Sequence, residues 1–259
     1  MRLSEARHAF ITGGASGIGL GIAEAFAARG IKVTIADIDA PALDDLLGAM
    51  GDNWHGTVLD VRDRPSWARA KVEAEATFGP VDILVNNAGI APNGREFADM
   101  EPESFDRIIA INLTGVANGV FTFAREMRDR RRGHIVNTAS MAGLATSIPG
   151  IGAYSVAKFG VVAMSEGLRG ELAPYGVGVS VLCPSYVATN LSVNTAKVGG
   201  ETRAGGSVAM PPSTLSPAQV GAKVAAAIDE GRFYIITHPE AWTRVAERHE
   251  ELRAAFAPE

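Results

Sequence analysis

The segment Thr-Gly-Gly-Ala-Ser-Gly-Ile-Gly at residues 12–19 follows a short apolar run and opens into a helical pattern with apolar Ile22, Ala25 and Phe26. Glycines let the main chain turn tightly and approach a ligand, while the free N–H groups at the start of the following helix attract negative charge. We therefore expect a diphosphate to bind at this turn. The residues predicted to surround it are Gly13, Ser16, Gly17, Ile18 and Gly19. The alternative is an ordinary glycine turn, which its position at the first strand–helix crossing disfavours.

Outward from this turn, short apolar runs alternate with longer segments of helical period. Strands are expected at His8–Thr12, Lys32–Ala36, Gly56–Asp60, Ile83–Asn86, His134–Thr138, Val177–Cys183 and Phe233–Ile236. Helices are expected at Gly17–Arg29, Ala40–Met50, Arg64–Phe78, Glu103–Arg130, Tyr154–Pro174, Pro217–Glu230 and Glu240–Phe256. The pattern predicts an α/β fold: one doubly wound Rossmann-type domain over residues 1–259, with a seven-stranded parallel sheet and helices on both faces.

Composition narrows the classes of protein to consider. The 259 residues are 47% hydrophobic and 20% charged, as in folded soluble proteins. The formal charge of −5 argues against a nucleic-acid partner. A single cysteine, Cys183, and the lack of an unbroken apolar stretch at the N-terminus or of an 18-residue apolar run predict a cytoplasmic protein away from membranes. No metal site is predicted.

The second predicted strand is followed by Asp37, 18 residues past Gly19. A carboxylate at this position can accept hydrogen bonds from an adenosine ribose and would repel a 2′-phosphate. The next residue, Ile38, is not basic, so we expect NAD(H) to be preferred over NADP(H). Asp37 could instead be a solvated cap of the following helix, and Arg62 and Arg64 are the residues most able to favour a phosphate.

The Gly-x-x-x-Gly-x-Gly spacing of the loop resembles the short-chain dehydrogenase/reductase family, and the likeness extends over nearly the whole chain. The further matching motifs are Asp60-Val61, Asn86-Asn87-Ala88-Gly89, Asn112, Ser140 and Tyr154-x-x-x-Lys158. The resemblance implies that Asp60 and Val61 lie at the adenine and that Asn87 and Gly89 lie beside the cofactor ribose. It also implies a catalytic tetrad of Asn112, Ser140, Tyr154 and Lys158.

The resemblance further implies that Pro184, Val187 and Thr189 border the nicotinamide, although Ser185 stands where the family usually has glycine. It implies a homotetramer, with a dimer as the alternative, assembled through the predicted helices 103–130 and 154–174.

Chemistry at the predicted tetrad agrees with this likeness. Removing a hydride from an alcohol requires a base for the hydroxyl proton, and a phenol with a pKa near 10 is a poor one. Tyr154 and Lys158 share one helix face, where an ammonium about 4 Å away would supply about 4 kcal/mol and lower the tyrosine pKa by up to about three units. Desolvation opposes this shift, but we expect the net pKa to fall. Ser140 would donate a hydrogen bond to the substrate oxygen.

Asn112 has two open interpretations. By resemblance it holds a water that serves as a proton relay, and from the sequence it is equally a buried amide joining the helix to a neighbouring strand.

Apolar and aromatic residues follow the catalytic ones. The candidate pocket residues are Met141, Ala142, Tyr186 and Leu191, which suit a hydrophobic secondary alcohol or ketone. Residues 233–240 resemble the branch that contains bacterial aryl-alcohol Cα-dehydrogenases, which extends the expectation to aryl substrates. The segment 190–216 lacks a helical stripe and is predicted to be a mobile substrate lid, with Arg95, Lys197 and Arg203 solvated.

The leading hypothesis is an NAD-dependent alcohol dehydrogenase or ketone reductase. The alternatives are a non-catalytic module that senses NAD(H), an NADP-dependent carbonyl reductase, and an epimerase or dehydratase on the same scaffold.

Overall fold

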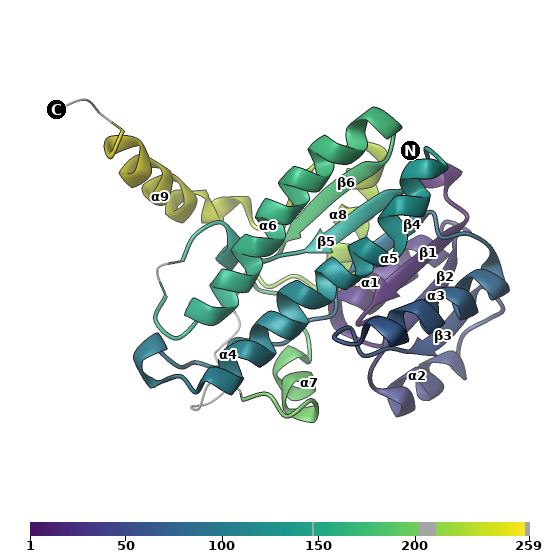
Figure 1. Cartoon of the computed structure of the whole chain (residues 1–259), viewed down its shortest axis with the longest axis horizontal. Helices are drawn as coiled ribbons and strands as arrows, with labels where there is room; N and C mark the ends of the chain where they lie inside the picture. Colours follow the sequence, from purple (N-terminus) through teal and green to yellow (C-terminus); the bar gives the residue numbers. More distant parts are fainter. Residues whose placement is uncertain (147, 202–210, 257–259) are drawn as a thin grey trace.

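The computed structural model describes residues 1–146, 148–201 and 211–256. Its centre is a parallel sheet of seven strands in the order β3-β2-β1-β4-β5-β6-β7 (Figure 1). The strands are β1 (His8–Thr12), β2 (Lys32–Asp37), β3 (Trp54–Val58), β4 (Ile83–Asn86), β5 (His134–Thr138), β6 (Gly178–Cys183) and β7 (Tyr234–Ile236). All residues of β1, β4 and β5 are buried, as expected of strands covered on both faces. The predicted α/β fold is confirmed.

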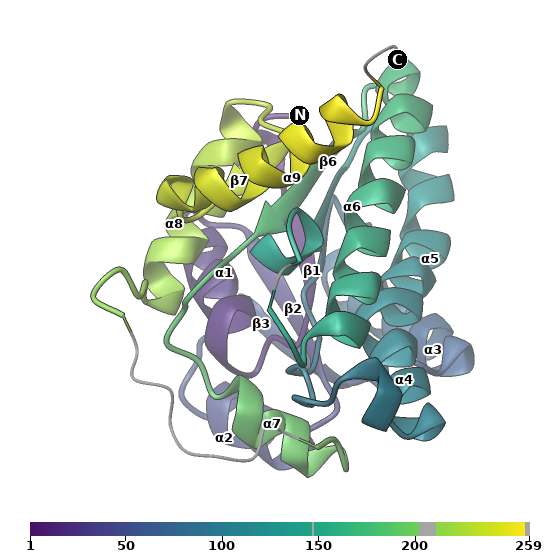
Figure 2. The ribbon, with the colours of Figure 1, turned by 90° about the vertical axis from the view of Figure 1, so that its left-hand side faces the viewer.

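Helices cover both faces of the sheet. One layer holds α1 (Gly17–Ala27), α2 (Ala40–Leu47) and α8 (Pro217–Asp229), and the other holds α3 (Arg64–Phe78), α4 (Pro102–Ile109), α5 (Gly115–Asp129) and α6 (Gly152–Leu172). Each layer packs its own apolar core against the sheet, and the largest fully buried side chain is Trp67 on α3. The short helix α7 (Leu191–Lys197) lies below the sheet in Figure 2, and α9 (Trp242–Ala254) extends away from the body in Figure 1.

The long helix predicted over 103–130 is interrupted. Residues Ala110–Thr114 form one π-helical turn between α4 and α5. A π turn inside an α-helix is frequently a functional feature, and this one contains the candidate residue Asn112. By length and composition alone, Pro102–Asp129 would be long and apolar enough to cross a membrane, but half of its most apolar stretch is buried in the protein, as in the core helix of a globular domain.

The strand order reverses direction between β1 and β4. Consecutive connections from β1 run outward to β2 and β3, whereas those from β4 run outward to β5, β6 and β7. In open parallel sheets the loops at such a switch point diverge and leave a crevice at the carboxyl ends of the strands. The loops after β1 and β4 carry the glycine turn and the Asn86–Gly89 motif, so the fold places both motifs at that crevice.

Candidate active site

A cavity of about 720 Å³ opens at the carboxyl ends of the strands, within the range typical of cofactor and ligand sites. It is lined by the glycine turn, the ends of β2, β4 and β5, the start of α6 and the segment from Pro184 to Val198. The predicted site residues that line it are Gly13, Ser16, Gly17, Ile18, Asp37, Ile38, Asp60, Val61, Asn87, Gly89, Asn112, Ser140, Tyr154, Lys158, Pro184, Tyr186, Val187, Thr189 and Leu191. Gly19, Met141 and Ala142 do not line it; Gly19 packs beneath the turn, and Met141 packs partly buried against the apolar core.

The glycine turn is built for close approach to an anion. Gly13 and Gly17 have φ values of +62° and +54°, which favour glycine. A Cβ on Gly19 would lie 2.2 Å from the carbonyl oxygen of Gly13, so the turn also packs too tightly for any side chain there. Ser16 precedes α1 without a side-chain cap, which leaves the first N–H groups of the helix free for a ligand. These features fit the diphosphate of a dinucleotide.

Asp37 lies at the end of β2 and is fixed to this turn. Its Oδ2 accepts a hydrogen bond from the Ala15 N–H at 3.1 Å, and its Oδ1 accepts one from the Asp39 N–H at 3.2 Å. The nearby guanidinium of Arg62 forms a two-pronged pair with Asp60, with contacts of 2.6 to 3.1 Å. Arg64 does not line the cavity and donates to the Asn118 side chain. Arg62, the cation that lines the cavity beside Asp60, is therefore already paired.

Tyr154, Lys158 and Ser140 converge from two elements. Tyr154 and Lys158 project from adjacent turns of α6, and the Lys158 Nζ lies 5.5 Å from the centroid of the Tyr154 ring. Ser140 follows β5, and the turn behind it packs directly on α6, since a Cβ on Gly143 would lie 2.5 Å from the Lys158 carbonyl oxygen. Lys158 Nζ also donates to the Thr138 carbonyl at 2.9 Å. The predicted shared face is confirmed.

Burial dominates the titration of this group. Desolvation lowers the pKa of Lys158 to about 8. Desolvation also raises the pKa of the Tyr154 phenol, while a hydrogen bond with Ser140 acts in the lowering direction. The expected net lowering of the tyrosine pKa is therefore wrong for the protein's own groups. Tyr154 is partly buried where it lines the cavity, and the desolvation cost of its anion exceeds the help from the Ser140 hydrogen bond.

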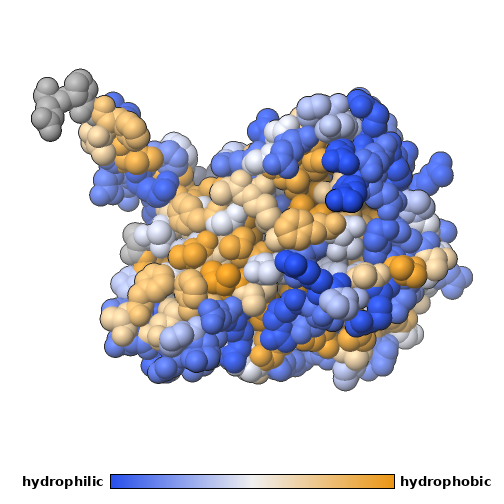
Figure 3. All heavy atoms as spheres, viewed as in Figure 1, coloured by the Kyte–Doolittle hydropathy of each residue, from blue (hydrophilic) through white to orange (hydrophobic). Residues whose placement is uncertain are grey.

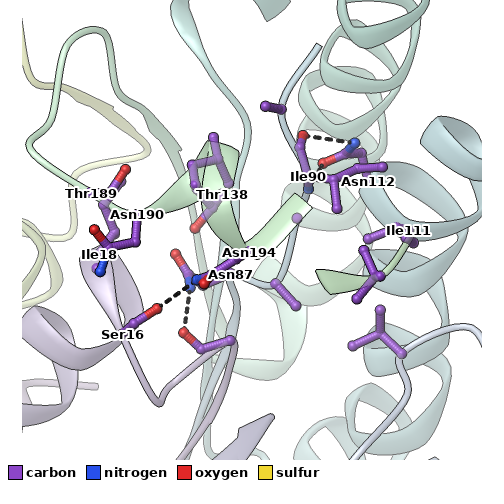
Figure 4. Close-up of a pocket in the computed structure, with 18 of the residues that line it drawn as sticks. Ser16, Ile18, Asn87, Ile90, Ile111, Asn112, Thr138, Thr189, Asn190 and Asn194 are labelled. Carbon is purple, nitrogen blue, oxygen red and sulfur yellow. Dashed lines mark hydrogen bonds between the residues drawn. The ribbon is translucent and has the colours of Figure 1, made fainter. Parts of the chain in front are cut away.

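Asn112 joins the π turn to the segment after β4. Its Oδ1 accepts from the Ile90 N–H at 3.1 Å, and its Nδ2 donates to the Ile90 carbonyl at 3.2 Å (Figure 4). Gly89 lies in the same contact, because a Cβ there would be 2.7 Å from Asn112 Oδ1 and 3.6 Å from Lys158 Nζ. Asn112 is thus a buried amide that joins the π turn to the segment after β4, and its side chain lies beside Lys158.

The segment expected to lack helix contains α7, which closes over the cavity. Asn194 Nδ2 donates to Ser16 Oγ at 2.9 Å (Figure 4), and Thr195 Oγ1 accepts from the Ala91 N–H at 2.9 Å. Lys197 is more than half exposed, as expected of a solvated cation, and its ammonium also pairs with Asp39 at 2.7 Å. The sequence concealed this helix because Thr195 is its only buried residue, and long-range contacts hold it.

The other expected solvated cations have separate outcomes. Arg95 is more than half exposed and lies 3.5 Å from Glu201. Arg203, and the part of the predicted lid from 202 to 210, lie outside the described residues.

Several lining residues escaped the sequence analysis. They are Ile90, Ile111, Thr138, Asn190 and Asn194. Thr138 had a usable signal, since it ends a buried strand two residues before Ser140.

Ser185 has no positive φ, so its replacement of the usual glycine introduces no left-handed strain. Among residues 1–146, 148–201 and 211–256, no group of three His, Cys, Asp or Glu side chains is arranged to bind a metal.

Comparison with known proteins agrees with this geometry. The short chain dehydrogenase family matches residues 7–198 of the chain. A "C alpha-dehydrogenase" of a Sphingobium species is 36% identical over 96% of this chain and 86% of its own length. The oxidoreductase UcpA of Salmonella typhimurium is 39% identical over 73% of this chain and 72% of its own.

Solved structures give the same result. A short-chain dehydrogenase/reductase from Burkholderia phymatum in complex with NAD is 32% identical, covers 100% of this chain and 98% of its own, and superposes with a TM-score of 0.85. A short-chain dehydrogenase described from Novosphingobium aromaticivorans is 35% identical, covers 98% and 88% of the two chains, and has a TM-score of 0.83. The chain belongs to the short-chain dehydrogenase/reductase family of nicotinamide-dependent oxidoreductases.

Proposed function

We propose that this protein is an NAD-dependent dehydrogenase that interconverts a hydrophobic secondary alcohol and the corresponding ketone. The observation that carries the proposal is the convergence of Tyr154, Lys158 and Ser140 in one cavity with the glycine turn. A silent NAD(H)-sensing module would not need a cavity-lining phenol beside a buried ammonium.

Each catalytic residue has a defined task. The bound dinucleotide supplies the hydride acceptor for alcohol oxidation and the hydride donor for ketone reduction. Tyr154 takes the hydroxyl proton in oxidation and returns it in reduction. Lys158 stabilises the phenolate through its positive charge, which the pKa of about 8 retains at neutral pH. Ser140 donates its one hydroxyl hydrogen bond to the substrate oxygen as negative charge develops there.

Asn112 and Gly89 support this group. The buried amide fixes the π turn against the strand end, and the absent side chain at Gly89 leaves room for the Asn112 amide oxygen. In this role Asn112 is a positioning residue. Its place beside Lys158 is also compatible with a proton relay that reaches that lysine.

The preference for NAD over NADP rests on charge. The Asp37 carboxylate is held at the cavity by two backbone N–H groups, where a 2′-phosphate would meet a negative charge. Arg62 is engaged by Asp60 and Lys197 by Asp39, so neither offers an unpaired cation to such a phosphate.

Apolar and aromatic side chains line the cavity next to the residues expected at the nicotinamide. Tyr186 and Leu191 flank Val187 and Thr189 in sequence, and they line the cavity together with Pro92. These side chains favour a hydrophobic and, with Tyr186, an aromatic substituent beside the reacting carbon. The name of the Sphingobium relative, a C alpha-dehydrogenase, is consistent with such a substrate.

Assembly is part of the same proposal. Figure 3 shows apolar side chains exposed on the face that carries α4, α5 and α6. Phe121 on α5 is 69% exposed and Val156 on α6 is 46% exposed, so a second copy would bury apolar surface there. We propose that the protein is a homotetramer, or alternatively a dimer, in the cytoplasm. A monomeric mass by light scattering at micromolar protein concentration would contradict this assembly.

A cofactor-absorbance assay tests the function. Purified protein is given NAD or NADP with a panel of aryl and alkyl secondary alcohols, and the reduced cofactors with the matching ketones. We expect turnover with NAD(H) at a kcat/KM at least about tenfold above that with NADP(H), since like charges disfavour the phosphate. Binding of NADH without turnover of any panel member would favour the sensing module, and equal use of both cofactors would overturn the NAD preference.

A further inference from the structure

A buried polar chain connects β7 to the loop after β6. Thr237 and His238 directly follow β7 and are 4% and 3% exposed. Thr237 Oγ1 accepts a hydrogen bond from the Ser185 N–H at 3.2 Å and lies 2.7 Å from His238 Nδ1. His238 Nε2 lies 2.9 Å from the Ser213 carbonyl oxygen. All of these contacts lie outside the paired residues of β6 and β7.

The chemistry of the partners gives this chain a direction. A carbonyl oxygen can only accept, so His238 carries its proton on Nε2 and donates to Ser213. In the neutral ring Nδ1 is then an acceptor, which the Thr237 hydroxyl fills as donor. The Thr237 oxygen remains free to accept from Ser185. Both ring nitrogens of His238 therefore have one partner each, and the Thr237 hydroxyl has two, one as acceptor and one as donor.

The two ends of this hydrogen-bonded series, Ser185 and Ser213, lie at the start and at the end of the segment that follows β6 and contains α7. Ser185 precedes Val187 and Thr189, which line the cavity on its nicotinamide side by the family resemblance. Ser213 lies at the returning end of the same segment. There the Leu215 N–H donates to Tyr186 at 3.1 Å and the Ala188 N–H donates to Leu215 at 2.9 Å, forming a short bridge.

We propose that Thr237 and His238 are positioning residues that hold the nicotinamide-side loop and the closing limb of the covering segment in register. The inference rests on the proposed function, since the loop matters only if a nicotinamide binds beside it. Thr237 holds the loop after β6 in place through the Ser185 N–H. His238 holds the segment before α8 in place through the Ser213 carbonyl. Neither residue lines the cavity, so both act through the backbone.

Thr237→Val tests the first arm. Valine keeps the shape of threonine and removes the hydroxyl, which leaves the partly buried Ser185 N–H without its partner. We expect kcat and NADH affinity each to fall about tenfold, as for a displaced reacting group, while affinity for ADP stays within about twofold because ADP lacks the nicotinamide half. Thr237→Ser retains the hydroxyl and should restore both values. Thr77→Val is the matched control, since Thr77 donates to the Glu73 carbonyl on the exposed side of α3.

His238→Phe tests the second arm by removing both ring nitrogens at similar size. We expect the same loss of NADH affinity with ADP binding retained, measured by quenching of protein fluorescence on folded samples with matched melting curves.

The outcomes separate the inference from the proposed function. If wild type binds NADH but its kcat and NADH affinity equal those of Thr237→Val, the positioning role is overturned. Wild type that binds neither reduced cofactor overturns the proposed function itself. Parallel loss of ADP and NADH binding in Thr237→Val would assign these residues to general stability and also overturn the inference.

Discussion

Replacing Lys158 with methionine would remove the positive charge beside the phenol while keeping an unbranched apolar side chain. The Nζ lies 5.5 Å from the Tyr154 ring centroid. At that distance and an effective dielectric of about 20, Coulomb's law gives about 3 kcal/mol. This corresponds to about two pKa units, or about a hundredfold in the fraction of phenolate at neutral pH.

The assay is the pH dependence of kcat for alcohol oxidation at saturating cofactor and substrate. We expect the kcat of Lys158→Met at pH 7 to be about a hundredfold below that of wild type, because the fraction of phenolate falls by that factor. Because burial lowers the pKa of Lys158 to about 8, wild type loses the ammonium charge above that pH, and the difference between the two proteins should shrink there.

Lys223→Met is the control, since that lysine is exposed on α8 and far from the cavity lining. A kcat of Lys158→Met lowered equally at every pH would refute the electrostatic role and leave Lys158 as a positioning residue.

Three further predictions follow from other contacts. His134 is buried with its pKa lowered to about 4, so the unfolded chain binds the extra proton first and stability falls as pH drops from about 6.5 to 4, by about 3 kcal/mol; His134→Gln should flatten this slope in urea titrations. Gly89→Ala forces a Cβ to 2.7 Å from Asn112 Oδ1, so kcat should drop about tenfold or more in initial-rate assays, and an unchanged rate would show that the contact is not needed. Lys197→Met removes the pair with Asp39 that holds α7, so stopped-flow release of NADH should be a few-fold faster, whereas an equal release rate would remove α7 from control of the cofactor.

Sequence patterns predicted the central strands well because their apolar runs are continuous. The predicted bounds of β1, β4 and β5 match the structure. The edge strand β3 lies two residues earlier than predicted, since Trp54, His55 and Gly56 are only partly buried and give a weak apolar signal. Pattern also placed Tyr154 and Lys158 on one helix face, which follows from helical period alone.

What the sequence could not predict depends on contacts between distant residues. The π turn at Asn112 fits the apolar pattern of an unbroken helix, and α7 is held by partners from three other loops. The direction of the Tyr154 pKa shift failed for a similar reason. A spacing of four residues gives the distance to the ammonium, but the burial of the phenol depends on every element around it.

Hydride transfer by the Tyr154→Phe variant tests the central claim most directly. Phenylalanine keeps the ring and removes only the hydroxyl that carries the proton. We predict that single-turnover oxidation of NADH in the presence of a ketone substrate is abolished while NADH affinity stays within a few-fold of wild type. Near-normal turnover in this variant would contradict it.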